Sequence, residues 1–282
     1  MDIKFDNNFL IGDCIHGTMV WPKDDGVIGP CLKNYGEWSE GENIIMSQFI
    51  EKGDIVIDIG ANIGTTVLSL SKQVGNKGKV LAFEPQSQIS QCLNTNLTLN
   101  GITNVIVDNA AISKNCGWAK INDRDFEENG RYGEAGISES GSTKVRTINL
   151  DEIEVDNCSL IKIDIEGHEW EAIQGGKKFL LKHKPALYME AKKDQVGTEK
   201  FLKWLFENKW ICYWHYAFWY RKNNYKNYPN PIHNPGTGDM NIVAIHETKP
   251  QPLNLLKIES YKESWDENKL LEFYKANNLQ II

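Results

Sequence analysis

The chain has 282 residues, of which 41% are hydrophobic and 24% charged, as expected of a soluble globular protein large enough to bury a substantial core. Its formal net charge is -7 and it has no Lys/Arg run, so it lacks the clustered positive charge expected of a duplex-nucleic-acid-binding protein. A small-molecule or carbohydrate partner is therefore favoured. It has no apolar run of about 18 residues and no apolar N-terminal stretch, so we expect a cytoplasmic protein with no membrane partner.

Strand-like and helix-like segments alternate through the middle of the chain, in the order of a parallel sheet flanked by helices. Short apolar runs predict strands at residues 54–59, 79–83, 105–107, 160–165, 186–190, 210–215 and 240–245. Helical spacing and helix-end signals predict helices at residues 63–74, 87–100, 168–183 and 198–208. The fold class is therefore α/β.

This pattern divides the chain into three expected parts. An N-terminal lid or extension covers residues 1–50 and ends in a helix at residues 42–50, whereas residues 51–247 form the ligand-binding domain. A C-terminal helical extension covers residues 248–282. It contains a polar helix at residues 257–278 that docks through three side chains, Trp265, Leu270 and Tyr274.

Two irregular segments stand out within the domain. The stretch at residues 122–143 is polar and rich in Gly and Glu, so it has little to bury, and it precedes an added strand at residues 145–150. The Asn/Pro-rich loop at residues 221–238 is longer than most loops of compact domains, and such loops are often functional.

A glycine-containing turn follows the first strand, in "VIDIGANIGTT" at residues 56–66. Gly60 and Gly64 allow backbone to approach a ligand at a helix N-terminus, although a tight turn alone would also require them. Glu84 lies 24 residues after Gly60, at the end of the second strand in "AFEP", where an acid can accept both hydroxyls of a ribose. The combination predicts a nucleoside site.

The nucleoside could belong to NAD or to S-adenosylmethionine. Asn62 occupies the position where a dinucleotide loop needs glycine, and Asp58 would repel a pyrophosphate but could hold an ammonium group. Both residues favour S-adenosylmethionine. We expect this cofactor to lie over the loop from Asp58 to Thr65. After the third strand, Asp108, Asn109 and Ala110 offer polar groups and backbone near the expected adenine position.

The chain resembles the FkbM family of S-adenosylmethionine-dependent methyltransferases. The resemblance rests on motifs in the family's order from residue 35 to residue 245: "GEWSEGE", "GDIVIDIGANIGTTVLSLS", "GKVLAFEPQ", "NVIVDNAAIS", "TINLDE", "LIKIDIEGHEWEAIQGG" and "KPALYMEA". It implies a seven-stranded, mostly parallel Rossmann-like class I methyltransferase fold with helices on both faces. It also implies S-adenosylmethionine as donor and O-methylation of a hydroxyl, often on a sugar or natural product.

The resemblance assigns roles to individual positions. It implies that Gly60, Asn62 and Gly64 form the cofactor loop and that Glu84 binds the ribose. It places Asp164 beside the methyl group, and it favours a binding role for Glu37 in "GEWSEGE".

Acids gather at the ends of later strands, in "IKIDIEGHEW" and "ALYME". Ligands of open parallel sheets bind beyond these ends, and a hydroxyl acceptor needs a base, which typically contributes about 10²–10⁴-fold. Asp164 is the first candidate, Glu166 and Glu190 are supporting ones, and His168 is an alternative base. Glu166 could instead serve the N-terminus of the following helix, and His168 could be an ordinary helix-start residue.

Three converging acids could also hold Mg²⁺. However, no Asp-Asn pair follows the fourth strand, and the cysteines form no C-x-x-C pair. We therefore assign no residue as a metal ligand.

The aromatic run "WICYWHYAFWY" at residues 210–220 could stack a sugar ring or form sheet core. The sequence thus predicts an O-methyltransferase acting on a sugar, glycan or small natural product. The alternatives are a nicotinamide-dependent oxidoreductase and a non-catalytic carbohydrate-binding protein on the same fold.

Overall fold

A computed structural model describes residues 8–121, 136–138, 140–191, 196–252 and 254–277. Within these ranges no helix combines the length and the apolar character that a membrane crossing requires. The predicted polar stretch at residues 122–143 lies largely outside the described residues.

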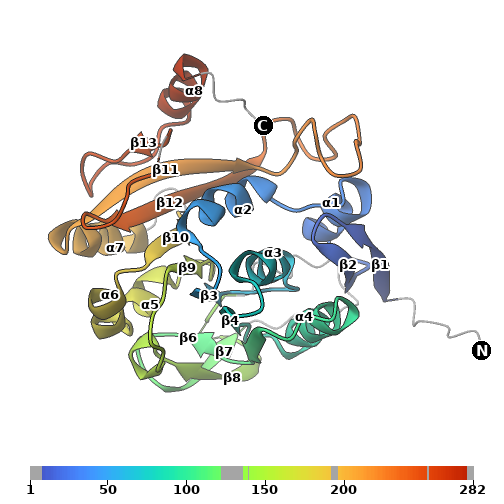
Figure 1. The fold of residues 1–282 in the computed structure, drawn as a ribbon, viewed down its shortest axis with the longest axis horizontal. Helices are drawn as coiled ribbons and strands as arrows, with labels where there is room; N and C mark the ends of the chain where they lie inside the picture. Colours follow the sequence, from blue (N-terminus) through green and yellow to red (C-terminus); the bar gives the residue numbers. More distant parts are fainter. Residues whose placement is uncertain (1–7, 122–135, 139, 192–195, 253, 278–282) are drawn as a thin grey trace, which may run out of the picture.

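The fold is built on an eight-stranded sheet with the order β13-β11-β12-β10-β9-β3-β4-β5 (Figure 1). Its strands are β3 (Ile55–Ile59), β4 (Lys79–Phe83), β5 (Val105–Asp108), β9 (Leu160–Ile163), β10 (Ala186–Glu190), β11 (Trp210–Phe218), β12 (Gly238–His246) and β13 (Leu256–Lys257). The five strands from β10 to β5 are parallel, whereas β11, β12 and β13 pair antiparallel. The predicted strands are all present, and β13 is an addition to the implied seven.

The order of the parallel strands reverses between β3 and β9. The chain runs outward from β3 through β4 to β5, then returns to place β9 on the other side of β3. In open α/β sheets such a switch point leaves a crevice at the carboxyl ends of the strands. The topology therefore positions a ligand site above β3 and β9.

Both faces of the sheet are covered, because strands buried on both sides project apolar side chains in both directions. On one face lie α3 (Thr65–Val74) and α4 (Ser87–Leu99), packed on a cluster that includes Val56 and Leu160. On the other lie α5 (Glu169–Gln174), α6 (Lys177–His183) and α7 (Val196–Glu207), packed on a cluster that includes Ile57 and Ile161. The α/β class with helices on both faces is confirmed.

The helix predicted at residues 168–183 is two helices. Gly175 and Gly176 separate α5 from α6, and glycine inside a helix is unfavourable. A Cβ at Gly175 would lie 2.3 Å from the backbone oxygen of Ser113, and one at Gly176 would lie 2.7 Å from Leu150. The prediction of one continuous helix was wrong because tight packing against these neighbours requires the glycine pair.

The N-terminal part lies beside α3 and α4. It comprises the hairpin β1 (Phe9–Cys14) and β2 (Gly17–Pro22), the helices α1 (Ile28–Asn34) and α2 (Glu40–Met46), and a 3₁₀ turn, η1 (Ser47–Phe49). The side chains of Asn96 on α4 and of Asn100, the residue directly after α4, each bind backbone N–H and C=O groups of β2, at Val20 and Thr18. These bonds satisfy an open strand edge, so the hairpin is fixed to the domain.

A separate three-stranded sheet holds the added strand. β8 (Thr143–Ile148) pairs parallel with β6 (Ala111–Ile112) and antiparallel with β7 (Gly117–Ile121). It lies below the main sheet in the view of Figure 1.

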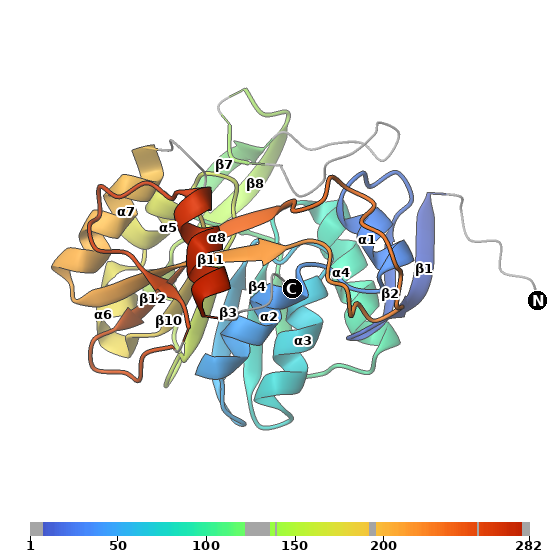
Figure 2. The same ribbon diagram turned by 90° about the horizontal axis from the view of Figure 1, so that it is seen from above.

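The C-terminal helix α8 (Glu267–Ala276) is shorter than the predicted span of residues 257–278. Leu256–Lys257 joins the sheet edge beside β11 as β13, and Asp266 caps the helix by accepting from the N–H groups of Asn268 and Lys269. Figure 2 shows α8 lying beside β11. Leu270 and Tyr274 are buried and Trp265 packs against the same cluster, as predicted.

Candidate active site

A cavity of about 330 Å³ lies at the carboxyl ends of the parallel strands. Its wall includes Gly60, Asn62 and Glu84 at the ends of β3 and β4, and Asp164 and Glu190 at the ends of β9 and β10. The volume is at the lower end of the range for small-molecule sites, about 300–1,000 Å³. The predicted cofactor loop and the predicted base thus share one cavity.

The glycine-containing turn adopts left-handed backbone conformations, with φ of 85° at Gly60, 48° at Asn62 and 92° at Gly64. A Cβ at Gly60 would lie 1.9 Å from the backbone oxygen of Asp164, so only glycine fits between β3 and β9. α3 begins directly after Gly64 without a side-chain cap, and Thr65 lines the cavity. Its N-terminal N–H groups therefore face the site.

Glu84 is buried, with 3% of its surface exposed, yet it lines the cavity. Its Oε2 accepts from the N–H of Asn62 at 2.9 Å and its Oε1 accepts from the N–H of Gln86 at 2.8 Å. Burial raises the pKa of Glu84 to about 7, against the opposing effect of these two donors. A carboxylate oxygen can accept more than one hydrogen bond, so Glu84 can still bind hydroxyl groups.

Of the three predicted adenine-site residues, Ala110 lines the cavity and the other two do not. Ala110 is buried and lines the cavity, whereas Asp108 pairs with Arg146 and does not line it. Asn109 is exposed, and its Nδ2 donates to the backbone oxygens of Glu84 (2.7 Å) and Pro85 (3.0 Å). Asn109 therefore supports the loop that carries Glu84.

Asp58 is fully buried behind the cavity wall and does not line it. Its Oδ1 lies 3.8 Å from Nζ of Lys162, and burial raises its pKa to about 6, which Lys162 partly opposes. A direct contact with a ligand ammonium group is not available to Asp58 in this conformation.

Glu37 also lies outside the cavity wall, with 2% of its surface exposed. Nε of Arg221 donates to Oε1 at 2.8 Å, and Nη2 donates to Oε2 at 2.9 Å. The N–H of Tyr225 donates to Oε2 at 2.8 Å. Glu37 thus ties the N-terminal part to the loop after β11, instead of facing a ligand.

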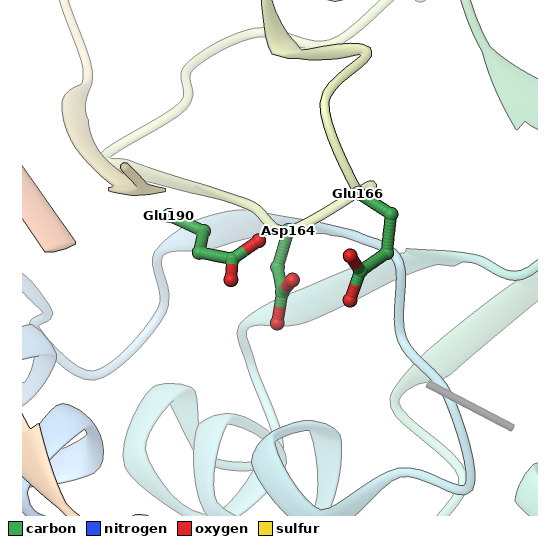
Figure 3. Close-up of side chains that lie close together, drawn as sticks. All are labelled: Asp164, Glu166 and Glu190. Atoms are coloured by element: carbon green, nitrogen blue, oxygen red, sulfur yellow. The ribbon is translucent and has the colours of Figure 1, made fainter. Parts of the chain in front are cut away.

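Asp164, Glu166 and Glu190 converge at the strand ends, side by side (Figure 3). One carboxylate oxygen from each lies within 4.8 Å of the others. Glu166 has a left-handed backbone, with φ of 57°, at the turn after β9. Such a trio offers oxygen ligands of the kind that Mg²⁺ prefers.

Lys162 is a site residue to which the sequence assigned no role. Its Nζ donates to Oδ2 of Asp164 at 3.1 Å and is buried, with 5% of the residue exposed. Burial lowers its pKa, but the neighbouring carboxylates, Asp164 first, outweigh this effect and hold the pKa above its usual range. Lys162 is therefore a fixed positive charge beneath Asp164, and strand alternation on β9 was the signal for their common face.

Two other acids of this region, Glu190 and Glu42, carry raised pKa values. Burial, then the charges of Asp164 and Asp239, raises the pKa of Glu190 to about 10. Burial also raises the pKa of Glu42 to about 8, with Lys162 opposing and Asp239 adding to it. Both side chains line the cavity and are protonated near neutral pH.

His168 lines the cavity and lies at the start of α5. Its Nε2 is 3.0 Å from Oγ of Ser113, and its Nδ1 is 3.7 Å from Oε2 of Glu171. Burial lowers the pKa of His168, and the negative charge of Glu171 partly opposes this effect. The neighbouring acid Glu169 accepts from the N–H groups of Gly167 (3.0 Å) and Ile165 (3.4 Å), so it holds the turn before the helix.

The aromatic run divides between core and cavity. Trp210 and Trp214 are buried in the hydrophobic cluster, whereas Trp219 lines the cavity together with Trp38 and His233. Trp219 belongs to the run for which the sequence left sugar stacking and sheet core open, whereas His233 and, on β12, Asp239 and Asn241 are site residues that sequence reasoning did not identify. The aromatic run at residues 210–220 and the length of the loop at residues 221–238 were the two sequence signals for a functional role in this region.

Three comparisons relate the chain to known proteins. The methyltransferase FkbM domain family matches residues 58–218. The hexuronic acid methyltransferase AglP of Haloferax volcanii is 32% identical over 129 residues, which are 44% of this chain and 51% of AglP. The chain therefore spans about half the length of this curated relative.

Solved structures are more distant. A methyltransferase FkbM from Methylobacillus flagellatus KT is 19% identical with a TM-score of 0.48, covering 70% of this chain and 44% of that one. An S-adenosylmethionine-dependent O-methyltransferase from Thermotoga maritima is 17% identical with a TM-score of 0.42, covering 86% of this chain and 79% of that one.

Proposed function

Because the chain belongs to the methyltransferase FkbM family, we propose that it transfers a methyl group from S-adenosylmethionine to a hydroxyl of a sugar, a glycan or a small natural product. One observation carries the proposal: a single cavity is lined by the glycine-containing turn with Glu84 and by Asp164. The name of AglP, a hexuronic acid methyltransferase, supports a carbohydrate acceptor.

Glu84, Asn62, Thr65 and Ala110 would hold the donor. The chemistry of this set fits a nucleoside, since Glu84 is a buried acceptor for the ribose hydroxyls and Ala110 offers an apolar surface at the end of β5. The backbone N–H groups at the start of α3 would face the donor's carboxylate. Asp58 would act from behind the wall by fixing Lys162.

Asp164 would be the base. The donor supplies a methyl carbon on a positively charged sulfur, and the electron pair of the broken C–S bond stays on that sulfur. The acceptor oxygen forms the new bond to carbon, and its proton passes to the carboxylate of Asp164. Lys162 holds this carboxylate through its 3.1 Å hydrogen bond.

The remaining predicted catalytic residues would have supporting roles. Glu190, with its pKa raised to about 10, cannot accept a proton near neutral pH but can donate a hydrogen bond to the acceptor. Glu166 would border the same subsite, and His168 would be a secondary base. No step of this mechanism requires Mg²⁺.

The division of the chain follows from the same proposal. Residues 51–247 would bind the donor, residues 1–50 would cover the acceptor end of the cavity through Trp38 and Glu42, and residues 248–282 would stabilise the sheet edge.

Calorimetric titration tests donor binding. We expect the protein to bind S-adenosylmethionine and not NAD. Glu84→Ala should weaken the binding about 10-fold or more, which is about 1.4 kcal/mol or more, because it removes the hydroxyl acceptor. Asp108→Ala is the matched control, since this acid also ends a strand but lies outside the cavity wall, and it should change the affinity less than about two-fold.

Two results would contradict the donor assignment: tight NAD binding without S-adenosylmethionine binding, or equal losses in the two variants. Glu84→Gln, which keeps one acceptor oxygen, separates a binding defect from a folding defect. Release of S-adenosylhomocysteine from a pool of sugar acceptors, with mass-spectrometric identification of the labelled product, tests transfer itself.

A further inference from the structure

Three aromatic rings from two distant parts of the chain line the cavity: one precedes α2, and two lie in the connection between β11 and β12. Trp38 precedes α2, Trp219 follows β11, and His233 lies in the loop before β12. Ring centroids are 5.1 Å apart both for Trp38 with Trp219 and for Trp219 with His233. Nε1 of Trp219 donates to Oδ2 of Asp239 at 2.6 Å, so the indole is held in one orientation. A fixed ring at a cavity wall offers a flat apolar surface to a ligand.

Polar groups surround this aromatic wall. Glu190 ends β10 directly opposite Asn241 of β12, and both line the cavity with Asp239. Carboxyl and amide groups beside a flat apolar surface suit a ligand that has an apolar face and a rim of hydroxyls. A pyranose ring has this character.

The charges of the cavity wall limit which charge a ligand can carry. This half of the cavity is formed by the aromatic wall and the ends of β9, β10 and β12. Among its described residues there is one lysine, Lys162, whose Nζ lies 3.1 Å from Asp164 and 3.8 Å from Asp58. The carboxyl groups of the same half are Asp164, Glu166 and Asp239, together with Glu42 and Glu190, whose raised pKa values keep them uncharged near neutral pH, so the repulsion comes from the first three. Further negative charge would be repelled here, since like charges at close range in a partly buried site are costly.

We propose that Trp38, Trp219, Asp239 and Asn241 form the acceptor subsite, and that it takes an uncharged hexose ring in preference to a sugar with a carboxylate. The ring stacks on Trp219, and its hydroxyls bind Asp239, Asn241 and Glu190. This inference rests on the proposed function, and it separates the acceptor of this chain from a hexuronic acid.

Binding of matched sugars tests the charge preference without requiring turnover. The probes are methyl hexopyranosides of glucose, galactose and mannose and the corresponding methyl hexuronosides, titrated by calorimetry into the protein with S-adenosylhomocysteine. We expect at least one hexopyranoside to bind at least about 10-fold more tightly than its hexuronoside, a difference of about 1.4 kcal/mol in binding free energy. Equal binding, preference for the hexuronoside, or no hexopyranoside binding would overturn the proposal.

Variants test the stacking surface. Trp219→Ala should weaken binding of the preferred hexopyranoside about 10-fold, while Trp219→Phe, which keeps a ring, should retain most of it. Trp118→Ala is the control, because this indole is 64% exposed on the separate three-stranded sheet. Asp239→Asn should reduce the discrimination against the hexuronoside. Unchanged affinity in Trp219→Ala would refute the stacking role.

The two proposals can fail separately. If the hexopyranoside binds as expected but no S-adenosylhomocysteine is released with any acceptor, the subsite stands and the transfer reaction falls. If transfer occurs and favours hexuronosides, the reaction stands and the charge argument falls.

Discussion

The two halves of the cavity are built in different ways. The donor half consists of strand ends and the loops that directly follow them, with Gly60 to Gly64 after β3, Glu84 after β4 and Ala110 after β5. The acceptor half assembles side chains from distant parts of the chain, including Trp38, Trp219 and Asn241. A local segment thus suffices for a backbone cradle, whereas a shaped acceptor surface depends on long-range contacts.

The buried pair of Glu37 and Arg221 offers the largest test of this contrast, because it joins the two distant segments of the acceptor half. Glu37→Ala leaves a buried guanidinium without its counter-ion, so we expect a loss of about 3–5 kcal/mol in the free energy of unfolding, measured by denaturant titration. Glu207→Ala breaks an exposed pair with Lys203 on α7 and should cost less than about 0.5 kcal/mol. Similar losses in the two variants would show that the buried pair does not hold the acceptor half together.

Asp164→Asn tests the boundary between the halves. The amide keeps an oxygen for Lys162 but is a poor base, so we expect turnover to fall about 10²-fold or more while donor affinity stays within a few-fold. Steady-state kinetics and donor titration measure the two effects, with the exposed Asp156→Asn as control. Equal loss of turnover and donor affinity would assign Asp164 to the donor half or to structure.

Glu42 gives the smallest effect, a pH dependence of stability in the acceptor half. Its pKa is about 8 in the folded protein and near 4.5 when unfolded, so the folded state binds more protons between these values. Its contribution to stability is fully present below pH 4.5 and is lost as the pH rises through about 8.

Glu42→Gln removes this titration and keeps an oxygen for Ser39. We expect its Tm to exceed that of the wild type by a few °C at pH 8 and by less at pH 5, measured by scanning calorimetry. Glu51→Gln, at an exposed site, should show no such difference. A constant Tm difference across this pH range would contradict the raised pKa.

Several parts of the fold and site could be predicted from sequence because their signals are local. β-branched runs predicted the strands, and Gly60, Glu84 and Asp164 each follow a strand directly. The carboxyl ends of parallel strands meet at one edge, so these residues had to converge. The predicted single helix at residues 168–183 failed because packing on Ser113 and Leu150, which lie far away in sequence, sets the glycine break.

Motif reasoning was least informative where a polar residue needs a distant partner. Glu37 lies in a motif that suggested ligand binding, but Arg221 is 184 residues further along and engages both of its oxygens. The aromatic run posed the same difficulty, since no local rule separates Trp214 in the core from Trp219 at the cavity.

Local sequence signals were therefore enough to establish the α/β class, the positions of the strands along the chain and the residues that follow each strand, because hydrophobic periodicity and glycine conformation act over a few residues. Folding establishes which charges are paired, which carboxyl groups keep their protons and which rings face the cavity. Those properties depend on burial and on neighbours brought together by folding, and burial changes the free energy of a charge far more than sequence position does.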